Sequence, residues 1–206
     1  MAPSGAEPPQ IRFTDVAFRY SEYDVPFWAR ANTQDGRWHC AREAPVQYMS
    51  LSPDAAWADL LRHENLRTEP EAAMVRMPLW VLKVDESRIV DYSSFEKAEA
   101  AGFPPDALID DHWARCQAEG ARLRALGMRG VLGPSAAVAG EVSLTLFGGR
   151  RAVDWDDEPL VASAVPAKVV TVGAPAMGLV GKVRFFGTEH VGYSAYAEAR
   201  GRREGQ

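Results

Sequence analysis

Short segments of alternating apolar residues recur along the chain, and this pattern limits the folds that it can adopt. Alternation of apolar and polar positions over about four to eight residues is typical of a half-buried β-strand. Residues 130–136 fit either a strand or a turn that leads into a loop. Strands are predicted over residues 11–20, 46–52, 77–84, 141–148, 167–172 and 180–186.

Helical spacing is confined to two stretches. Ser52 can cap a helix and Pro53 suits its first turn, so we predict a helix over residues 53–67. A second helix is predicted over residues 108–126 and ends at Gly127. Strands and helices do not alternate regularly, and there is no Gly-x-Gly-x-x-Gly motif, which argues against a Rossmann-type site. The fold class predicted is α+β, with many short strands and few helices.

The ends of the chain differ in composition from its middle. Residues 1–10 are rich in Pro, Gly and Ala, and residues 200–206 form a polar tail, so we expect both segments to be disordered. No linker or repeat divides the rest, which we read as one domain over residues 11–199. The N-terminus lacks the features of a signal peptide, and no run of about eighteen apolar residues exists. We therefore expect a cytoplasmic protein with no membrane contact.

Charge and cysteine content exclude several classes of function. The net charge of −5 disfavours a general role in direct nucleic-acid binding, which requires a basic surface. Four dispersed histidines and the absence of a cysteine cluster predict no metal site. Cys40 and Cys116 lie far apart, and we expect both to be reduced thiols.

Four residues in the first third of the chain have side chains suited to binding an anion or to acid–base chemistry. Arg19 lies inside an apolar strand pattern, where the alternative is a solvated edge position. Arg37 stands between Gly36 and a tryptophan, where a guanidinium can bind a phosphate or simply belong to a loop. Tyr48 lies in a strand and is also compatible with the core. Asp59 falls inside the first helix, where it faces a cleft or pairs with a basic neighbour.

The order of these residues resembles the RES domain. The pattern runs from Phe-Arg19 through Gly-Arg37-Trp and Pro-Val-Gln-Tyr48 to Ser-Pro and Ala-Trp-Ala-Asp59-Leu-Leu, and much later comes Gly-Pro-Ser135-Ala. The resemblance covers most of the chain, from about Phe18 to Phe147. The run from Gly-Arg-Trp to Leu-Leu is its specific part.

The resemblance implies a single domain similar to the ADP-ribosyltransferase fold, with NAD in a cleft. Members of the family are toxins of RES–Xre toxin–antitoxin pairs that break the nicotinamide–ribose bond of NAD by phosphorolysis or hydrolysis. NAD is then a substrate, with inorganic phosphate as a co-substrate in phosphorolysis, and no separate cofactor is implied. The implied protein partner is an Xre-like antitoxin, and a homodimer is left open. Two other readings stand beside this one: a non-catalytic descendant that binds NAD or a partner, and a protein ADP-ribosyltransferase.

The resemblance also assigns roles to residues. Arg19, Arg37, Tyr48 and Ser135 would bind NAD, and Arg37, Tyr48 and Asp59 would be catalytic. The family's glutamate falls eleven positions after the tyrosine, where this chain has Asp59. A second departure is His39, where the family often has asparagine.

A carboxylate at this position can stabilise an oxocarbenium-like transition state. Asp59 keeps that charge on a side chain one methylene shorter than glutamate. Glu69 is the next candidate carboxylate, whereas Glu64 would point away along the helix. His63 shares the helix face of Asp59 and is read as a surface partner. We expect Arg19 and Arg37 to converge on one cleft bordered by Tyr48.

Overall fold

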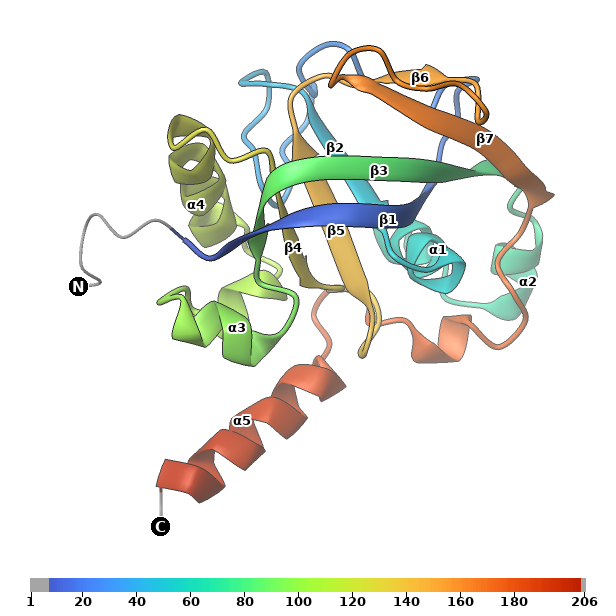
Figure 1. Ribbon diagram of the computed structural model, residues 1–206. Helices are drawn as coiled ribbons and strands as arrows, with labels where there is room; N and C mark the ends of the chain where they lie inside the picture. The colour runs from blue at the N-terminus through green and yellow to red at the C-terminus, as the bar shows by residue number, and fades with distance from the viewer. Residues whose placement is uncertain (1–7, 205–206) are drawn as a thin grey trace.

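The computed structural model describes residues 8–204, and its strands form a curved sheet that closes on itself. The strands are β1 (Gln10–Tyr20), β2 (Val46–Ser50), β3 (Met77–Asp91), β4 (Gly130–Pro134), β5 (Val142–Phe147), β6 (Arg151–Val153) and β7 (Ala164–Gly173). The order β1-β2-β5-β4-β3 returns to β1, and β7 and β6 continue from β3 (Figure 1). The result is a barrel-like sheet within one mixed α/β domain.

β3 closes this ring because it has three neighbours. β1 runs antiparallel along nearly its whole length, from Gln10 opposite Val90 to Tyr20 opposite Leu79. β7 pairs antiparallel with the first part of β3, and β4 pairs parallel with its last residues. Buried apolar side chains from β3, β4 and β5 meet inside the ring and form one part of the core.

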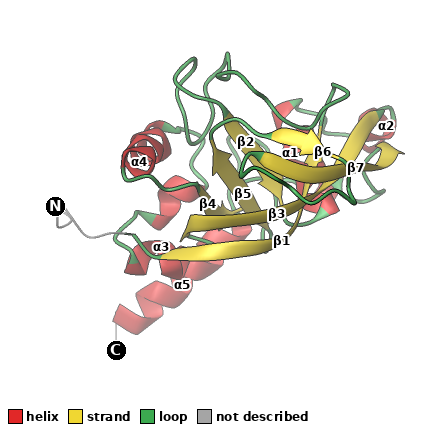
Figure 2. Ribbon diagram, turned by 45° about the horizontal axis from the view of Figure 1, so that its top comes forward, coloured by secondary structure: helices red, strands yellow, loops and turns green. Residues whose placement is uncertain are grey.

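Helices flank the ring on two sides, as Figures 1 and 2 show. α3 and α4 lie on one side, α1 and α2 on the other, and α5 runs beneath α3. Phe95 of α3 contacts Tyr193 and Tyr196 of α5, with ring centroids 5.3 and 5.4 Å apart. The α-helices are α1 (Pro53–His63), α2 (Glu69–Ala73), α3 (Phe95–Ala100), α4 (Ala114–Ala125) and α5 (Val191–Glu204). No helix among the described residues is both long enough and apolar enough to cross a membrane.

The strands predicted from alternation are present except for one. The strand predicted over residues 180–186 is wrong: a short 3-10 helix occupies Val180–Lys182, and irregular chain follows. The two phenylalanines that follow pack individually against arginine side chains instead of forming a strand. Phe185 lies under the guanidinium of Arg67, and Phe186 lies under that of Arg62. β3 extends seven residues beyond the predicted end at residue 84.

The helix predictions were correct in type and wrong in extent. The first helix ends at His63 because Asn65 adopts a left-handed conformation with φ 55°, and a separate helix α2 begins after Thr68. The second helix starts only at Ala114, since Pro104 and the 3-10 helix Pro105–Leu108 come before it. It ends as predicted before Gly127, which has φ 73°.

Both predicted disordered ends need correction. α5 continues to Glu204, so the tail predicted from residue 200 is helical over most of its length. Within this helix, Arg200 forms an ion pair with Glu99 of α3 at 3.0 Å. At the other end, β1 begins at Gln10, and the carbonyl of Pro9 accepts a hydrogen bond from the Asp91 amide at 3.1 Å. The prediction for residues 1–7 lies outside the described residues.

Candidate active site

Three of the predicted site residues line one small cavity between β1, β2 and α1. They are Arg19, Tyr48 and Asp59, each from a different one of these elements. β1 and β2 pair at a single position, Phe18 opposite Ser50, so the cavity lies where the two strands part. Its volume is about 20 Å³, roughly enough for one water molecule. Its other lining residues are Phe18, Tyr20, Met49, Ser50 and Ala56.

Arg19 supplies the positive charge of this cavity. One guanidinium nitrogen donates to Oε1 of Gln47 at 3.1 Å, and the guanidinium carbon lies 5.8 Å from the centre of the Trp28 ring. No carboxylate among the described residues lies within ion-pair distance of it. Burial lowers the pKa of Arg19 to about 10, which still leaves it cationic near neutral pH. A half-buried guanidinium without a counter-charge is a binding site for an anion.

Gln47 holds Arg19 in place and is itself fully buried in β2. Its Oε1 also accepts from the Trp28 amide at 3.0 Å, and its Nε2 donates to the Trp28 carbonyl at 2.8 Å. The side-chain amide of Gln47 is thus fixed by hydrogen bonds to both backbone groups of Trp28. A glutamine inside the apolar run of β2 is the signal by which the sequence alone could have indicated this role.

Tyr48 is fixed through its hydroxyl. The hydroxyl oxygen lies 3.0 Å from the Trp38 amide nitrogen and 2.8 Å from Nδ1 of His39. Burial raises the pKa of Tyr48, although the Trp38 amide and the charge of Arg37 act in the opposite direction. Gly36 is required beside this pair, because a Cβ there would lie 2.5 Å from the hydroxyl oxygen and 2.4 Å from the His39 ring.

Asp59 is brought to the cavity by the register of α1. The hydroxyl of Ser52 accepts from the Ala55 amide at 3.1 Å and so caps the helix as predicted. It also donates to Glu141 at 2.8 Å, which ties the start of α1 to the segment before β5. The Asp59 carboxylate is partly exposed and lies 3.9 Å from Nε2 of His63. Its charge adds to the effect of burial in raising the pKa of Tyr20 across the cavity.

Arg37 and Ser135 do not line this cavity. Arg37 donates to the carbonyl oxygens of Asp110 at 2.8 Å and Ala107 at 3.3 Å, and so attaches its loop to the segment before α4. Ser135 is buried, and its hydroxyl accepts from the amides of Ala137 at 3.2 Å and Val138 at 3.3 Å. Convergence of Arg19 and Arg37 on one cleft therefore stays a prediction.

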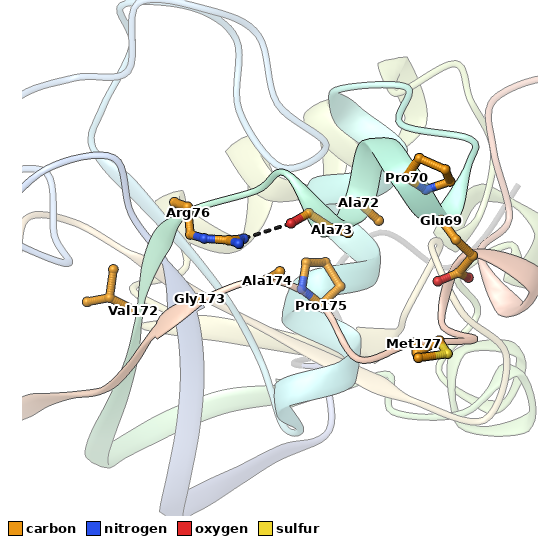
Figure 3. A pocket seen from close by; sticks show the side chains of 10 residues that line it. All are labelled: Glu69, Pro70, Ala72, Ala73, Arg76, Val172, Gly173, Ala174, Pro175 and Met177. Atoms are coloured by element: carbon orange, nitrogen blue, oxygen red, sulfur yellow. Dashed lines mark hydrogen bonds between the residues drawn. The ribbon is translucent and has the colours of Figure 1, made fainter.

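A larger groove lies elsewhere, between α2 and the end of β7 (Figure 3). Its volume is about 640 Å³, and none of Arg19, Tyr48 and Asp59 lines it. Its polar groups are already used: Arg76 donates to the Ala73 carbonyl at 2.7 Å, and Glu69 accepts from the Gly178 amide at 3.2 Å. Glu69, the second candidate carboxylate, lines this groove and not the cavity that Arg19 and Tyr48 line together with Asp59.

Sequence reasoning considered Arg62 only as a solvent-facing partner of Asp59. That reading is wrong, because Arg62 is one of the most buried side chains and pairs with Asp111 instead. It donates to the carbonyls of Ala136 and Arg184 at 2.5 and 3.0 Å and to Asp111 at 2.6 Å. The ring of Phe186 lies 4.2 Å from its guanidinium. This network fixes the C-terminal turn of α1, one turn after Asp59.

The cavity combines a cation, a carboxylate and an aromatic side chain in one place. Such a set can hold an anionic ligand with a flat ring and can stabilise a cation that develops beside the carboxylate. No group of three His, Cys, Asp or Glu side chains that could hold a metal exists within residues 8–204.

This chain is similar to known proteins in sequence and in fold. The family model described as the RES domain matches residues 12–166. The NAD(+) phosphorylases MbcT of Mycobacterium bovis and Mycobacterium tuberculosis are 26% identical to this chain over 136 residues, which are 64% of the chain and 73% of each relative.

A solved structure is similar as well. It is the M. tuberculosis MbcT–MbcA toxin–antitoxin complex, of which one chain superimposes with a TM-score of 0.57 at 26% identity. The match covers 68% of this chain and 76% of that one. Because the family model matches well over half of the residues, this chain belongs to the RES domain family.

Proposed function

We propose that this chain is a RES-type toxin that cleaves the nicotinamide–ribose bond of NAD, with phosphate or water as the acceptor. The family membership and the activity named for the MbcT relatives support the proposal. The observation that carries it is the meeting of an uncompensated arginine, Arg19, with a carboxylate, Asp59, in one cavity. We further propose that the cleft is related to that of ADP-ribosyltransferases.

Each residue has a role in this proposal. Loss of nicotinamide leaves positive charge on the ribose, and the Asp59 carboxylate stabilises it electrostatically. Arg19 binds an anionic part of NAD, with Arg37 as a second cation for the pyrophosphate. Ser135 is assigned to NAD binding through the loop that it supports. Tyr48 contacts the nicotinamide–ribose end.

The lining of the cavity, not its size, indicates which end of NAD would lie there. Pockets that enclose drug-sized ligands measure roughly 300–1,000 Å³, whereas this cavity has a volume of only about 20 Å³. We assign to its mouth the nicotinamide and its ribose, which carry the bond that breaks, because the Asp59 carboxylate lines it. The adenosine half would lie outside.

The test is product analysis with purified protein. NAD is incubated with and without inorganic phosphate, and nicotinamide, ADP-ribose and ADP-ribose phosphate are separated by chromatography. Phosphorolysis gives nicotinamide and the phosphorylated sugar, whereas hydrolysis gives free ADP-ribose. Asp59→Asn should abolish cleavage because it keeps the shape and removes the charge. Asp54→Asn, at an exposed position in the first turn of the same helix, is the matched control and should retain activity.

Other outcomes would assign the chain differently. Binding of NAD without any cleavage would make it a non-catalytic relative, and transfer of labelled ADP-ribose to protein would make it a transferase. Unchanged cleavage by Asp59→Asn would remove this carboxylate from the mechanism.

We also propose an antitoxin of the Xre-like kind as the protein partner. The support is that the similar solved structure is a toxin–antitoxin complex. Expression of this chain alone should deplete cellular NAD and stop growth, and co-expression of the antitoxin should restore both. Harmless expression with an unchanged NAD pool would contradict the proposal.

A further inference from the structure

His39 is a buried histidine whose two ring nitrogens both have partners. Nδ1 lies 2.8 Å from the Tyr48 hydroxyl, and Nε2 lies 3.1 Å from the carbonyl oxygen of Gln34. Only 2% of the residue is exposed. This residue stands where the family resemblance implies asparagine.

The partners determine where the protons lie. A carbonyl oxygen only accepts hydrogen bonds, so Nε2 of His39 must carry a hydrogen. Burial lowers the pKa of His39, which favours the neutral ring and leaves Nδ1 without a hydrogen. Nδ1 therefore accepts, and the Tyr48 hydroxyl must donate to it.

The Tyr48 hydroxyl has one proton, and this contact uses it. The same oxygen accepts from the Trp38 amide at 3.0 Å. The loop that carries both partners is held firmly by α4, where Gln117 donates to the Gly36 carbonyl at 3.1 Å and Arg124 donates to the Trp38 carbonyl at 2.7 Å. The hydroxyl is thus directed toward this loop, and its one proton is not available to a ligand in the cavity that Tyr48 lines.

We propose that His39 is a positioning residue that withdraws the hydroxyl of Tyr48 from the cavity, so that Tyr48 meets the substrate through its ring face. The inference rests on the proposed function for the identity of the substrate. The nicotinamide ring of NAD is flat and positively charged, and an aromatic face attracts such a group. The hydroxyl then makes no hydrogen bond to the ribose.

The first test needs no substrate. Nitrogen-15 NMR of uniformly labelled protein at pH 7.5 distinguishes a ring nitrogen that carries hydrogen from a bare one. The His39 signals are identified by their loss in His39→Asn. A bare Nδ1 and a protonated Nε2 are expected. The opposite tautomer, or a doubly protonated ring, would overturn the proposal whether or not the chain cleaves NAD.

The second test uses KM for NAD. Tyr48→Leu removes the ring and should raise KM about 2- to 13-fold above that of Tyr48→Phe, which keeps it. Equal KM values in the two variants would show that the ring does not serve the substrate and would overturn the proposal. Thermal unfolding of each variant checks that it is folded.

A double-variant cycle separates positioning from general stability. His39→Leu should raise KM in the wild-type background and add no further rise in Tyr48→Phe, where there is no hydroxyl to place. His39→Asn should recover part of the loss, since an amide oxygen can accept from the hydroxyl. The same rise in both backgrounds would make His39 a merely structural residue and refute the inference.

Discussion

Replacing Arg62 by methionine should destabilise the domain strongly. The substitution removes three hydrogen bonds and leaves the carbonyls of Ala136 and Arg184 without this donor. Asp111 would still accept hydrogen bonds from the Arg184 guanidinium at 2.9 Å and from the Gly187 amide at 2.7 Å. Breaking a buried ion pair from one side costs about 3–5 kcal/mol. Because Asp111 retains these partners, we expect the lower end, about 3 kcal/mol.

The assay is urea unfolding followed by circular dichroism, together with thermal unfolding. For a chain of this length, about 3 kcal/mol corresponds to a fall in Tm of roughly 6–12 °C. The matched control is Arg12→Met, because Arg12 also meets an aspartate, Asp85, at 2.6 Å, but on the exposed surface. Such surface pairs contribute little, and we expect no resolvable change there. Similar losses in both variants, or a loss below about 1 kcal/mol for Arg62→Met, would refute the reasoning.

Three further predictions concern the site and the pH response. Gln47→Leu should raise KM for NAD, since it frees Arg19 from its acceptor, and should also lower Tm because the Trp28 backbone groups lose their partner. Asp59→Glu should preserve or raise kcat if the reach of the carboxylate limits the native protein; a fall would show that the shorter side chain fits its site. Burial lowers the pKa of His190 below 6.5, so the unfolded chain takes up the proton first, and the free energy of unfolding should fall as pH drops below about 6.5. Urea titrations from pH 7.5 to 5 test this, and His190→Asn should flatten the slope.

Much of the candidate site could be predicted because its residues lie close together in the sequence. Arg19, Tyr48 and Asp59 stand on β1, β2 and α1, three elements whose patterns are clear from local alternation, a cap and a proline. The RES resemblance then supplied their order. The structure brings these three together, which sequence spacing alone does not require.

The supporting residues could not be found in this way, because their partners are distant in the sequence. In the sequence, Arg62 resembles any basic residue near a helix end. Its acceptors, the carbonyls of Ala136 and Arg184, lie far away along the chain. α5 was missed because its helical pattern is weak, and aromatic contacts with Phe95 hold it in place. The strand predicted over residues 180–186 failed for a related reason, since tertiary contacts of single side chains outweighed β-propensity.

The distance in sequence between the site and its supports has a consequence for synthesis of the chain. Asp59 leaves the ribosome early, but the residues that support the site come much later. The end of α1 is held by the Arg184 carbonyl, and the Ser135 carbonyl is bound by His190. Roughly 130 residues separate Asp59 from His190, which at about 5–20 residues per second takes about 7–26 s. The first third and the last quarter of the chain must meet before the cavity has its final support. A nascent chain therefore carries the residues of the candidate site for many seconds before the supports of α1 are in place.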